Sequence, residues 1–247
     1  MTTITPDTET TETTERPLEE VVLFTLSAGD FFNALSNAAL FASKDDTLPT
    51  LSAVNFAYNS DTKALVAQAT DRYRLIFVRV ADELEVDYES FNFLVSLSDV
   101  KELIKKFRGF KKFSDPEIQL DIQDDHMEII YYEQGFEKTE FVRFIDGDYP
   151  KIASLLDTKE DTIEEKVSAF QSHEGFNQKY MEDVTKAADY RLTPSQRDPI
   201  TWFAIKQKSG MLMFWKHDFA VGLLMPIKRR NNAEIEPAPT TVPSWAS

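Results

Sequence analysis

A strand, a helix and then several strands follow one another twice in the apolar pattern of this chain. The first copy has an apolar strand at about 21–26 and a helix, with Phe31, Leu35, Ala38 and Ala42 at helical spacing, that ends near residue 43. The second has a helix from Ser98 to about Lys112. The other predicted strands lie at about 51–58, 64–69, 74–80, 92–96, 117–122, 127–132 and 138–144. An internal repeat is a fold-level signal, and this one predicts an α+β fold of two similar halves.

The pattern weakens after Leu156. Residues 157–175 are charged and predict a linker with one short helix at 163–170, and a helix at 176–190 then precedes strands near 200–206, 211–216 and 219–225. This last part has the elements of one half of the repeat. The expected organisation is an acidic Thr-rich disordered tail, a complete domain, the linker, half of a further domain and a Pro-rich disordered tail, at residues 1–22, 23–156, 157–175, 176–230 and 231–247.

Charge and cysteine content limit the possible functions. The chain carries 27 Lys and Arg against 42 Asp and Glu, a net charge of −15, so we expect it to repel nucleic acid except at a chosen surface. It has no cysteine, which excludes disulfides, thiol catalysis and thiolate zinc sites. Neither a signal peptide nor an apolar run of roughly 20 residues is visible, so we expect a cytoplasmic protein with no membrane partner.

Catalytic and cofactor patterns are absent from the sequence. The three histidines lie in separate segments without metal-ligand spacing, and the acidic pairs at 45–46 and 124–125 fall in turn contexts, where Asp bonds the backbone. With only 7 glycines, the chain has no Gly-rich phosphate loop. We therefore expect no enzyme activity, no metal and no cofactor.

Three separate stretches carry a resemblance to a known family. They are Ala69–Leu75 (Ala-Thr-Asp-Arg-Tyr-Arg-Leu), Ile145–Pro150 (Ile-Asp-Gly-Asp-Tyr-Pro) and Leu223–Lys228 (Leu-Leu-Met-Pro-Ile-Lys). In this order they resemble segments of the bacterial DNA polymerase III beta subunit, the replicative sliding clamp. The resemblance implies a DNA-clamp fold, with one complete domain and a partial second one. It also implies that the three stretches meet at one partner-binding groove between domains.

The residues that the resemblance assigns to this groove are mostly apolar. They are Thr70, Tyr73, Arg74, Leu75, Pro150, Leu155, Leu223, Met225, Pro226 and Ile227. Leu, Met and Pro suit an apolar groove for an extended peptide, while Thr70 and Arg74 are expected to hold its backbone or carboxylates. Taken without the resemblance, the first stretch is an ordinary hairpin turn formed by Asp71, and the last is a terminal core strand, against which Pro226 argues. Lys151–Ser154 departs from the family pattern, so partner specificity is expected to differ.

The second predicted helix concentrates positive charge. At roughly 100° per residue, Lys101, Lys105, Arg108 and Lys112 share one narrow sector beside a buried apolar sector. A solvated basic face without a partner remains one interpretation. The resemblance implies the other, a helix that faces the phosphates of duplex DNA without reading its sequence. The third helix repeats the pattern weakly with Lys179 and Lys186.

The resulting hypothesis is a shortened, phage-type sliding clamp that tethers a DNA polymerase and other replication proteins, each bound through a short peptide motif, to duplex DNA. A homo-oligomer is expected. If clamp rings use six domains, one and a half per chain predicts a different or irregular closed assembly or an incomplete ring, and four chains supply six only if their halves pair. The alternative is an adaptor or competitor of a resident clamp that keeps the peptide site but never encircles DNA. A metal-dependent nuclease is poorly supported, because no carboxylates converge.

Overall fold

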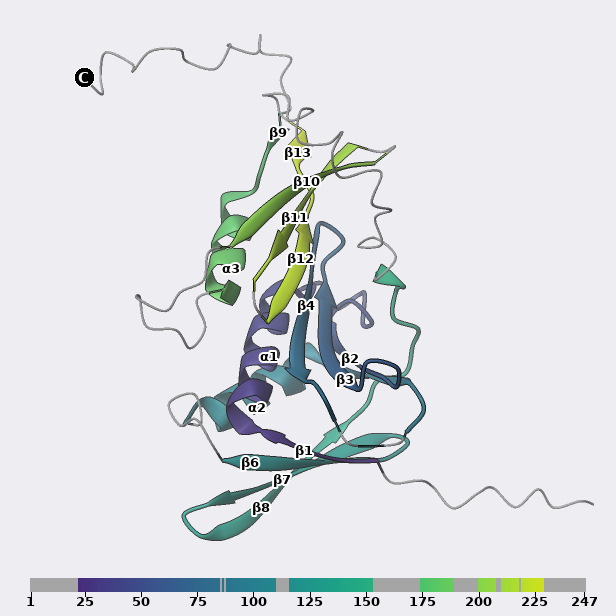
Figure 1. The fold of residues 1–247 in the computed structure, drawn as a ribbon, viewed down its shortest axis with the longest axis vertical. Coiled ribbons are helices and arrows are strands. Elements are labelled where there is room, and N and C mark those ends of the chain that lie inside the picture. The colour runs from purple at the N-terminus through teal and green to yellow at the C-terminus, as the bar shows by residue number, and fades with distance from the viewer. Residues whose placement is uncertain are drawn as a thin grey trace, which may run out of the picture.

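Among the residues that the computed structural model describes, two large antiparallel sheets, a two-stranded pairing and three helices make up the fold (Figure 1). The structure describes residues 22–84, 86, 88–109, 116–152, 174–188, 200–207, 210–217 and 219–228. One sheet has four strands in the order β1-β6-β7-β8, and the larger one has seven in the order β10-β11-β12-β4-β3-β2-β5. A short two-stranded pairing of β9 with β13 completes the described strands.

The first two units of the chain have the same order of elements. The first contains β1 (Val22–Ser27), α1 (Ala28–Phe41), β2 (Ala53–Asn59), β3 (Ala64–Thr70) and β4 (Arg74–Ala81). The second contains β5 (Phe91–Ser96), α2 (Leu97–Phe107), β6 (Glu117–Ile122), β7 (His126–Glu133) and β8 (Phe136–Arg143). The predicted repeat of a strand, a helix and three strands is therefore present.

The two units exchange their first strands. The strand before α1, β1, pairs with β6 of the second unit, and the strand before α2, β5, pairs with β2 of the first. Each unit thus completes a sheet of the other. Because each first strand lies in the other unit's sheet, neither unit forms its sheet alone.

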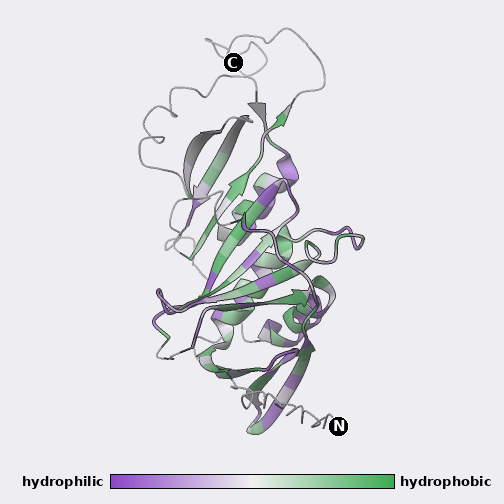
Figure 2. Cartoon of the chain, turned by 90° about the vertical axis from the view of Figure 1, so that its right-hand side faces the viewer, coloured by the Kyte–Doolittle hydropathy of each residue, from purple (hydrophilic) through white to green (hydrophobic). Residues whose placement is uncertain are grey.

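Helix capping and aromatic packing hold the helices in place. Ser27 and Ser96 precede α1 and α2, and the hydroxyl of each accepts a hydrogen bond from a backbone N–H of the first turn, at 3.3 and 3.1 Å. The helices pack side by side, with the rings of Phe31 and Phe107 edge to face at 6.0 Å. The alternation of hydrophobic and hydrophilic residues along the strands, visible in Figure 2, lets the sheets bury one face against these helices.

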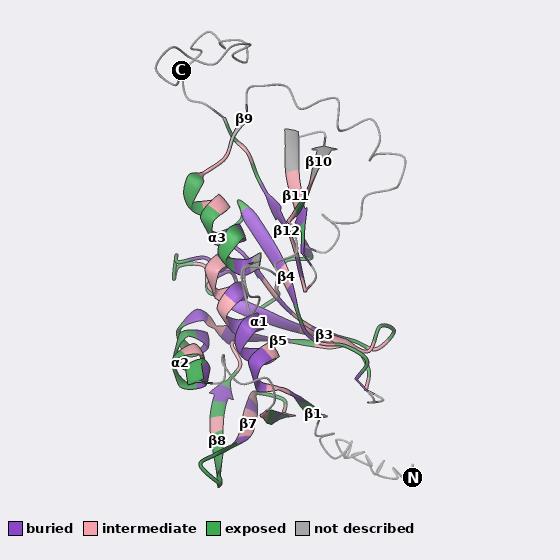
Figure 3. Cartoon of the chain, turned by 60° about the vertical axis from the view of Figure 1, so that its left-hand side comes forward, coloured by how far each residue is buried: buried purple, intermediate pink, exposed green. Residues whose placement is uncertain are grey.

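A third unit extends the larger sheet. It contains β9 (Glu174–Gly175), α3 (Gln178–Ala188), β10 (Thr201–Gln207), β11 (Gly210–Lys216), β12 (Ala220–Leu224) and β13 (Ile227–Lys228). Antiparallel pairing of β12 with β4, from Ala220↔Val78 to Leu224↔Arg74, joins it to the first unit. We call this junction of β4 and β12 the seam. In Figures 1 and 3 all three helices lie on one side of the seven-stranded sheet.

The predicted α+β class and most predicted elements are confirmed, with bounds that differ by a few residues. Strands β9 and β13 were not predicted, because they are two residues long and show no periodicity in the sequence. The predicted helix at 163–170, the end of the second helix near Lys112 and both terminal tails lie outside the described residues. In the part of the chain that the structure describes, no helix is both long and apolar enough to cross a membrane.

Candidate functional site

The corner between β3 and β4 is a tight turn built on Asp71. Its Oδ1 accepts hydrogen bonds from the backbone N–H groups of Tyr73 and Arg74, both at 3.1 Å. The Thr70 hydroxyl donates to the Arg74 carbonyl at 2.7 Å and accepts from the Arg72 N–H at 3.2 Å. Asp and Thr side chains form such local bonds readily. The turn expected from the residues alone is therefore present, and it already uses the hydroxyl that we expected to hold a peptide.

Arg74 is buried, which argues against the expectation that its guanidinium holds the backbone or carboxylates of a peptide. Nε donates to Asp71 Oδ2 at 2.9 Å, Nη1 to Asp183 Oδ2 of α3 at 2.7 Å, and Nη2 to the Leu40 carbonyl of α1 at 2.6 Å. The guanidinium also lies over the Tyr180 ring, 4.2 Å from its centroid. It is surrounded because β4 carries it into the junction of α1 and α3. The exposed guanidinium at this corner belongs to Arg72.

Asp183 accepts hydrogen bonds from two cationic side chains. Its Oδ1 accepts from Lys179 Nζ at 2.6 Å, opposite the Arg74 contact. Burial alone would raise the pKa of Asp183, but the hydrogen bonds from Lys179 and Arg74 outweigh it and lower the pKa below the ordinary value. We call Arg74, Asp71, Asp183 and Lys179 the seam network, because it ties α3 to the β3–β4 corner.

The three stretches that carry the resemblance come together beside the seam. Leu75 and Leu223 are directly opposite one another in the β4–β12 pairing, and they form one cluster with Ile152, which lies two residues after the Ile145–Pro150 stretch. All three are buried, at 3%, 3% and 6% exposure, although they lie in segments far apart in sequence. Half-buried Phe77, Tyr149 and Phe214 surround them. The result is a small apolar cluster, separate from the main core, at the predicted meeting point.

Exposed apolar side chains continue from this cluster toward solvent. Tyr73, Met225 and Ile227 are 59%, 42% and 47% exposed, and the Met225 N–H donates to the Tyr73 carbonyl at 2.8 Å. Pro226 is half-buried and lies between β12 and β13, as expected for a residue that cannot donate a ladder bond. Pro150 is exposed next to Tyr149, while Leu155 lies outside the described residues. We call the buried cluster with these exposed neighbours the seam surface.

Close backbone approach at the seam depends on one glycine. A Cβ atom at Gly222 would collide with the Leu75 carbonyl and lie 2.6 Å from Trp215 Nε1. The absence of a side chain thus lets β12 approach β4 with Trp215 packed beneath it. Any larger residue at position 222 would push the seam apart.

A shallow hollow of about 220 Å³ lies farther along the same strands. Val66, Phe77 and Val221 are among its lining residues, with Arg79 and Lys216 at its polar side. The sequence pattern did not assign Phe77, Phe214 or Ile152 to the site. Phe77 could have been found by alternation, because it is two residues from Leu75 on the same strand face. Phe214 and Ile152 could not, because their position depends on strand pairing and loop packing.

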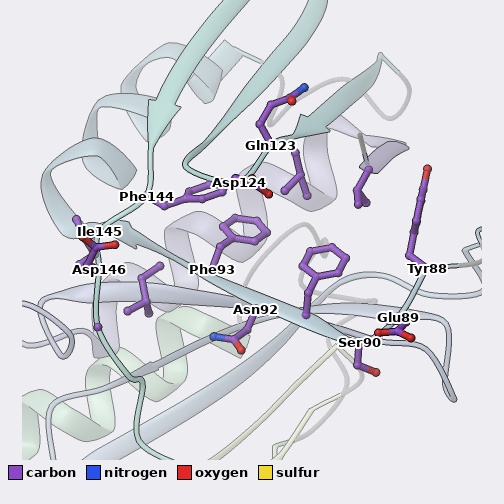
Figure 4. A pocket seen from close by; sticks show the side chains of 15 residues that line it. Tyr88, Glu89, Ser90, Asn92, Phe93, Gln123, Asp124, Phe144, Ile145 and Asp146 are labelled. Carbon is purple, nitrogen blue, oxygen red and sulfur yellow. The ribbon is translucent and has the colours of Figure 1, made fainter. Parts of the chain in front are cut away.

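A second and larger hollow lies elsewhere. It has a volume of about 570 Å³ and is lined by β5 and the segment after β8, with Phe93 and Phe144 on its wall (Figure 4). Glu89, Asp124 and Asp146 line it but do not form a metal site, since no group of three or more ligand side chains occurs among the described residues. None of the predicted peptide-site residues lines this hollow.

The predicted basic face lies on the solvent side of α2. Lys101, Lys105 and Arg108 are exposed, and Val100, Leu103 and Phe107 on the opposite face are buried. Lys105 Nζ is 2.6 Å from Glu102 Oε1, both side chains being more than half exposed. Lys106, outside the predicted face, instead pairs with Glu140 of β8. Lys112 lies outside the described residues. Helix α2 therefore has the predicted solvent-exposed basic face and, opposite it, a buried apolar face.

The two lysines of α3 are less available for contact with phosphates than those of α2. Lys179 belongs to the seam network, and its hydrogen bond with Asp183 raises its pKa. Lys186 Nζ lies 3.8 Å from both Glu182 and Asp183. Both side chains remain about half exposed, and helix α3 lies on the same side of the large sheet as α2 (Figure 3). Their charge is thus largely balanced by acids of the same helix.

Repeated units of a strand, a helix and three strands, with exchanged first strands and helices on one side, define the DNA-clamp fold that the resemblance implied. Comparison with solved structures agrees. The DNA polymerase III beta subunit of Pseudomonas aeruginosa is 13% identical, with a TM-score of 0.63 over 87% of this chain and 68% of that one. A Helicobacter pylori beta clamp bound to a DNA ligase peptide is 14% identical, with a TM-score of 0.61 over 88% and 69%.

Sequence comparison points to the same class. The chain is 33% identical over 132 residues to the beta sliding clamp of Micrococcus luteus, a match that spans 53% of this chain and 40% of that protein. No family model matches. The resemblance to bacterial DNA polymerase III beta subunits is therefore confirmed, and the chain has their fold, while the match spans less than half the length of this curated relative.

Proposed function

We propose that this protein is a shortened sliding clamp that tethers a DNA polymerase to duplex DNA and carries out no chemistry itself. The observation that supports this most is the seam surface, where Leu75, Ile152 and Leu223 form one buried cluster. Leu75 and Leu223 come from two of the stretches that resemble the clamp pocket, Ile152 lies two residues after the third, and Tyr149 of that third stretch packs against the cluster. A chance match of short motifs would not require them to be neighbours in space.

The seam surface has the chemistry of a site for an extended, partly apolar peptide. Met225 and Ile227 offer about half of their surface to a ligand, and Met adapts to different partners. Polar contacts to such a peptide are assigned to Arg72, since the Thr70 hydroxyl and the Arg74 guanidinium are already bonded within the protein. One solved neighbour, the Helicobacter pylori clamp, holds a DNA ligase peptide, which supports a peptide as the kind of ligand.

Contact with DNA is assigned to the basic face of α2. Lys101, Lys105 and Arg108 lie on one exposed side of the helix, in a chain whose net charge is −15. Such a face attracts phosphates without fixed hydrogen-bond geometry, so it favours no base sequence. The lysines of α3 add less, because acids of the same helix pair with them.

Peptide binding tests this proposal. The probe is a fluorescein-labelled short peptide with Leu and Phe anchors, followed by fluorescence anisotropy. Replacing both Met225 and Ile227 with Ala removes the apolar side chains that the peptide's anchors would contact. At about 25 cal/mol per Å² of buried apolar surface, the loss in binding free energy is on the order of 2 to 4 kcal/mol, or roughly thirtyfold to a thousandfold in affinity. The thermal midpoint should change little, since both side chains are more than 40% exposed.

A matched control is Leu23→Ala in β1. Leu23 is 43% exposed, similar to Met225, but it lies in the four-stranded sheet, away from the seam. Its loss should leave peptide affinity unchanged. If the double variant instead unfolds at a much lower temperature while its folded fraction binds normally, Met225 and Ile227 are core residues and the peptide site lies elsewhere.

A second candidate function is a peptide-binding adaptor or competitor that never encircles DNA. The observation that favours it is the pairing of Lys105, Lys179 and Lys186 with neighbouring acids, which leaves less positive charge for phosphates. An adaptor would keep the peptide site and lose topological retention on DNA.

A further inference from the structure

The third unit repeats the second, element by element. Each has a first strand, an 11-residue helix and three antiparallel strands, since β5-α2-β6-β7-β8 corresponds to β9-α3-β10-β11-β12. Each helix is preceded by a residue whose side chain accepts a backbone N–H, namely Ser96 for α2 and Asn177 for α3.

The segment that follows the last strand also corresponds. After β8, Phe144 forms a bridge with Val95 of β5, and the Ile145 N–H donates to the Leu94 carbonyl. After β12, β13 pairs with β9 through Ile227↔Gly175 and Lys228↔Glu174. The third unit thus forms the same kind of local pairing as the second, between its first strand and the segment after its last strand.

The comparison identifies what the third unit lacks. In the second unit, β6 pairs with β1 as well as β7, and β5 pairs with β2, so both gain strands from another unit. In the third unit, β10 pairs only with β11, and β9 only with β13, within the described part of the chain. Seven consecutive residues of β10, including Trp202, Phe203 and Ile205, thus form one end of the large sheet.

The first turn of α3 is less covered than the corresponding first turn of α2. Leu97 and Val100, the first and fourth residues of α2, are 4% and 0% exposed. The first and fourth residues of α3 are Gln178, which is exposed, and Met181, which is half-buried. Among the described residues, the first turn of α3 is therefore less covered than the first turn of α2.

We propose that the third unit is completed by the third unit of a second copy of this chain, so that two chains build one composite clamp-type domain around a two-fold axis. The first two units show how such units join: each gives its first strand to the other's sheet and packs its helix beside the other's. Each third unit contains the two elements that would complete the other: β9 as the added strand and α3 as the neighbouring helix. A closed two-fold pairing then satisfies both copies at once.

The same rule predicts the register of the shared strands. Within the complete domain, the residue before each helix pairs with the first residue of the partner unit's second strand, as in Ser27↔Glu117 and Ser96↔Ala53. Applied to the third unit, Asn177 of one copy faces Thr201 of the other. Counting along antiparallel strands, Glu174 then faces Ala204.

Cysteine cross-linking of the full chain tests this register. The protein has no cysteine, so the variant with both Glu174→Cys and Ala204→Cys carries only the two introduced thiols. Directly opposite residues have Cα separations within disulfide range. Mild oxidation should give a covalent dimer that a reductant separates, and neither single variant should give it. The unmodified protein should have at least the mass of a dimer by light scattering.

Glu174→Cys with Phe203→Cys is the matched control, because a shift of one residue points the second thiol to the other face of the strand. It should cross-link at least tenfold less. A ladder of covalent oligomers would indicate that the chains associate head to tail and not by a two-fold pairing, and it would overturn the proposal. An intramolecular disulfide, or a monomer mass for the unmodified protein at micromolar concentration, would also overturn it. The inference rests on the fold alone and needs no DNA or peptide.

Discussion

At the scale of single residues, the seam network explains why a residue predicted for ligand contact is structural instead. Arg74 connects the β3–β4 corner, the carbonyl end of α1 and the carboxylate of Asp183. The main partner on α3 is 109 residues away in sequence, so no local pattern could have indicated it. Asp71, by contrast, is recognisable as a turn former from the sequence, and the structure contains that turn.

Replacing Asp183 with Asn should destabilise the protein at neutral pH by about 3 kcal/mol, because it removes one carboxylate from a buried cation. The lowered pKa of Asp183 adds a pH dependence. Its contribution is present above the ordinary value of 3.8 and is lost as pH falls from there through the lower folded value. Denaturant unfolding from pH 7 down to about pH 2.5 should therefore show a shallower acid decline in the variant.

Glu182→Gln is the control for this substitution. Glu182 is on the same helix, but its side chain is 50% exposed and its nearest cations are 3.8 and 3.9 Å away. Its loss should cost well under 1 kcal/mol. Equal destabilisation of the two variants would mean that α3 docks by apolar contacts and that the seam network contributes little.

At the scale of elements, alternation and helical spacing predict nearly every long strand and helix. They do so because each element buries one face, which leaves a period of 2.0 or 3.6 in the sequence. Strands β9 and β13 were missed because two residues cannot show a period. The convergence of Leu75 and Leu223 followed from the resemblance and not from periodicity, and Ile152 was missed, since strand pairing between distant segments has no local signal.

The basic face of α2 yields a prediction about DNA. Changing Lys101, Lys105, Arg108 and Lys112 to Glu should abolish DNA association and leave the fold intact, because the described members of this set are exposed. In a less severe set of substitutions to Gln, removing each ionic interaction with a phosphate should reduce the salt slope of log K by about 0.9 for duplex DNA. Fluorescence anisotropy with a labelled duplex across a salt series measures both.

The control makes the same change of charge elsewhere. Arg79, Lys138, Arg143 and Lys216 lie on strands and are exposed, so their replacement by Glu alters net charge equally without touching α2. It should weaken binding only modestly. If both quadruple variants bind alike, net charge and not the α2 face governs DNA association, and the helix faces away from the duplex.

At the scale of the whole molecule, a continuous sheet joins the third unit to the first two, which exchange their first strands. Pairing of the third units of two chains would give three clamp-type domains per pair of chains. Two such pairs would supply six domains, the number assumed for clamp rings in the sequence analysis. The resemblance, together with the few residues that follow the linker, predicted half of a further domain, but the way in which a second copy could complete it required the pairing of β1 with β6 and of β5 with β2.

Retention on circular DNA tests the central claim, that the protein encircles duplex DNA, most directly. The protein is bound to nicked circular plasmid, together with a clamp loader if it does not load alone, and is separated from free protein by gel filtration at a salt concentration that screens surface charge. A closed ring predicts that protein stays with the circle and leaves when a restriction enzyme linearises it. Equal release from circular and linear plasmid would contradict encirclement and leave the peptide-binding adaptor as the better account.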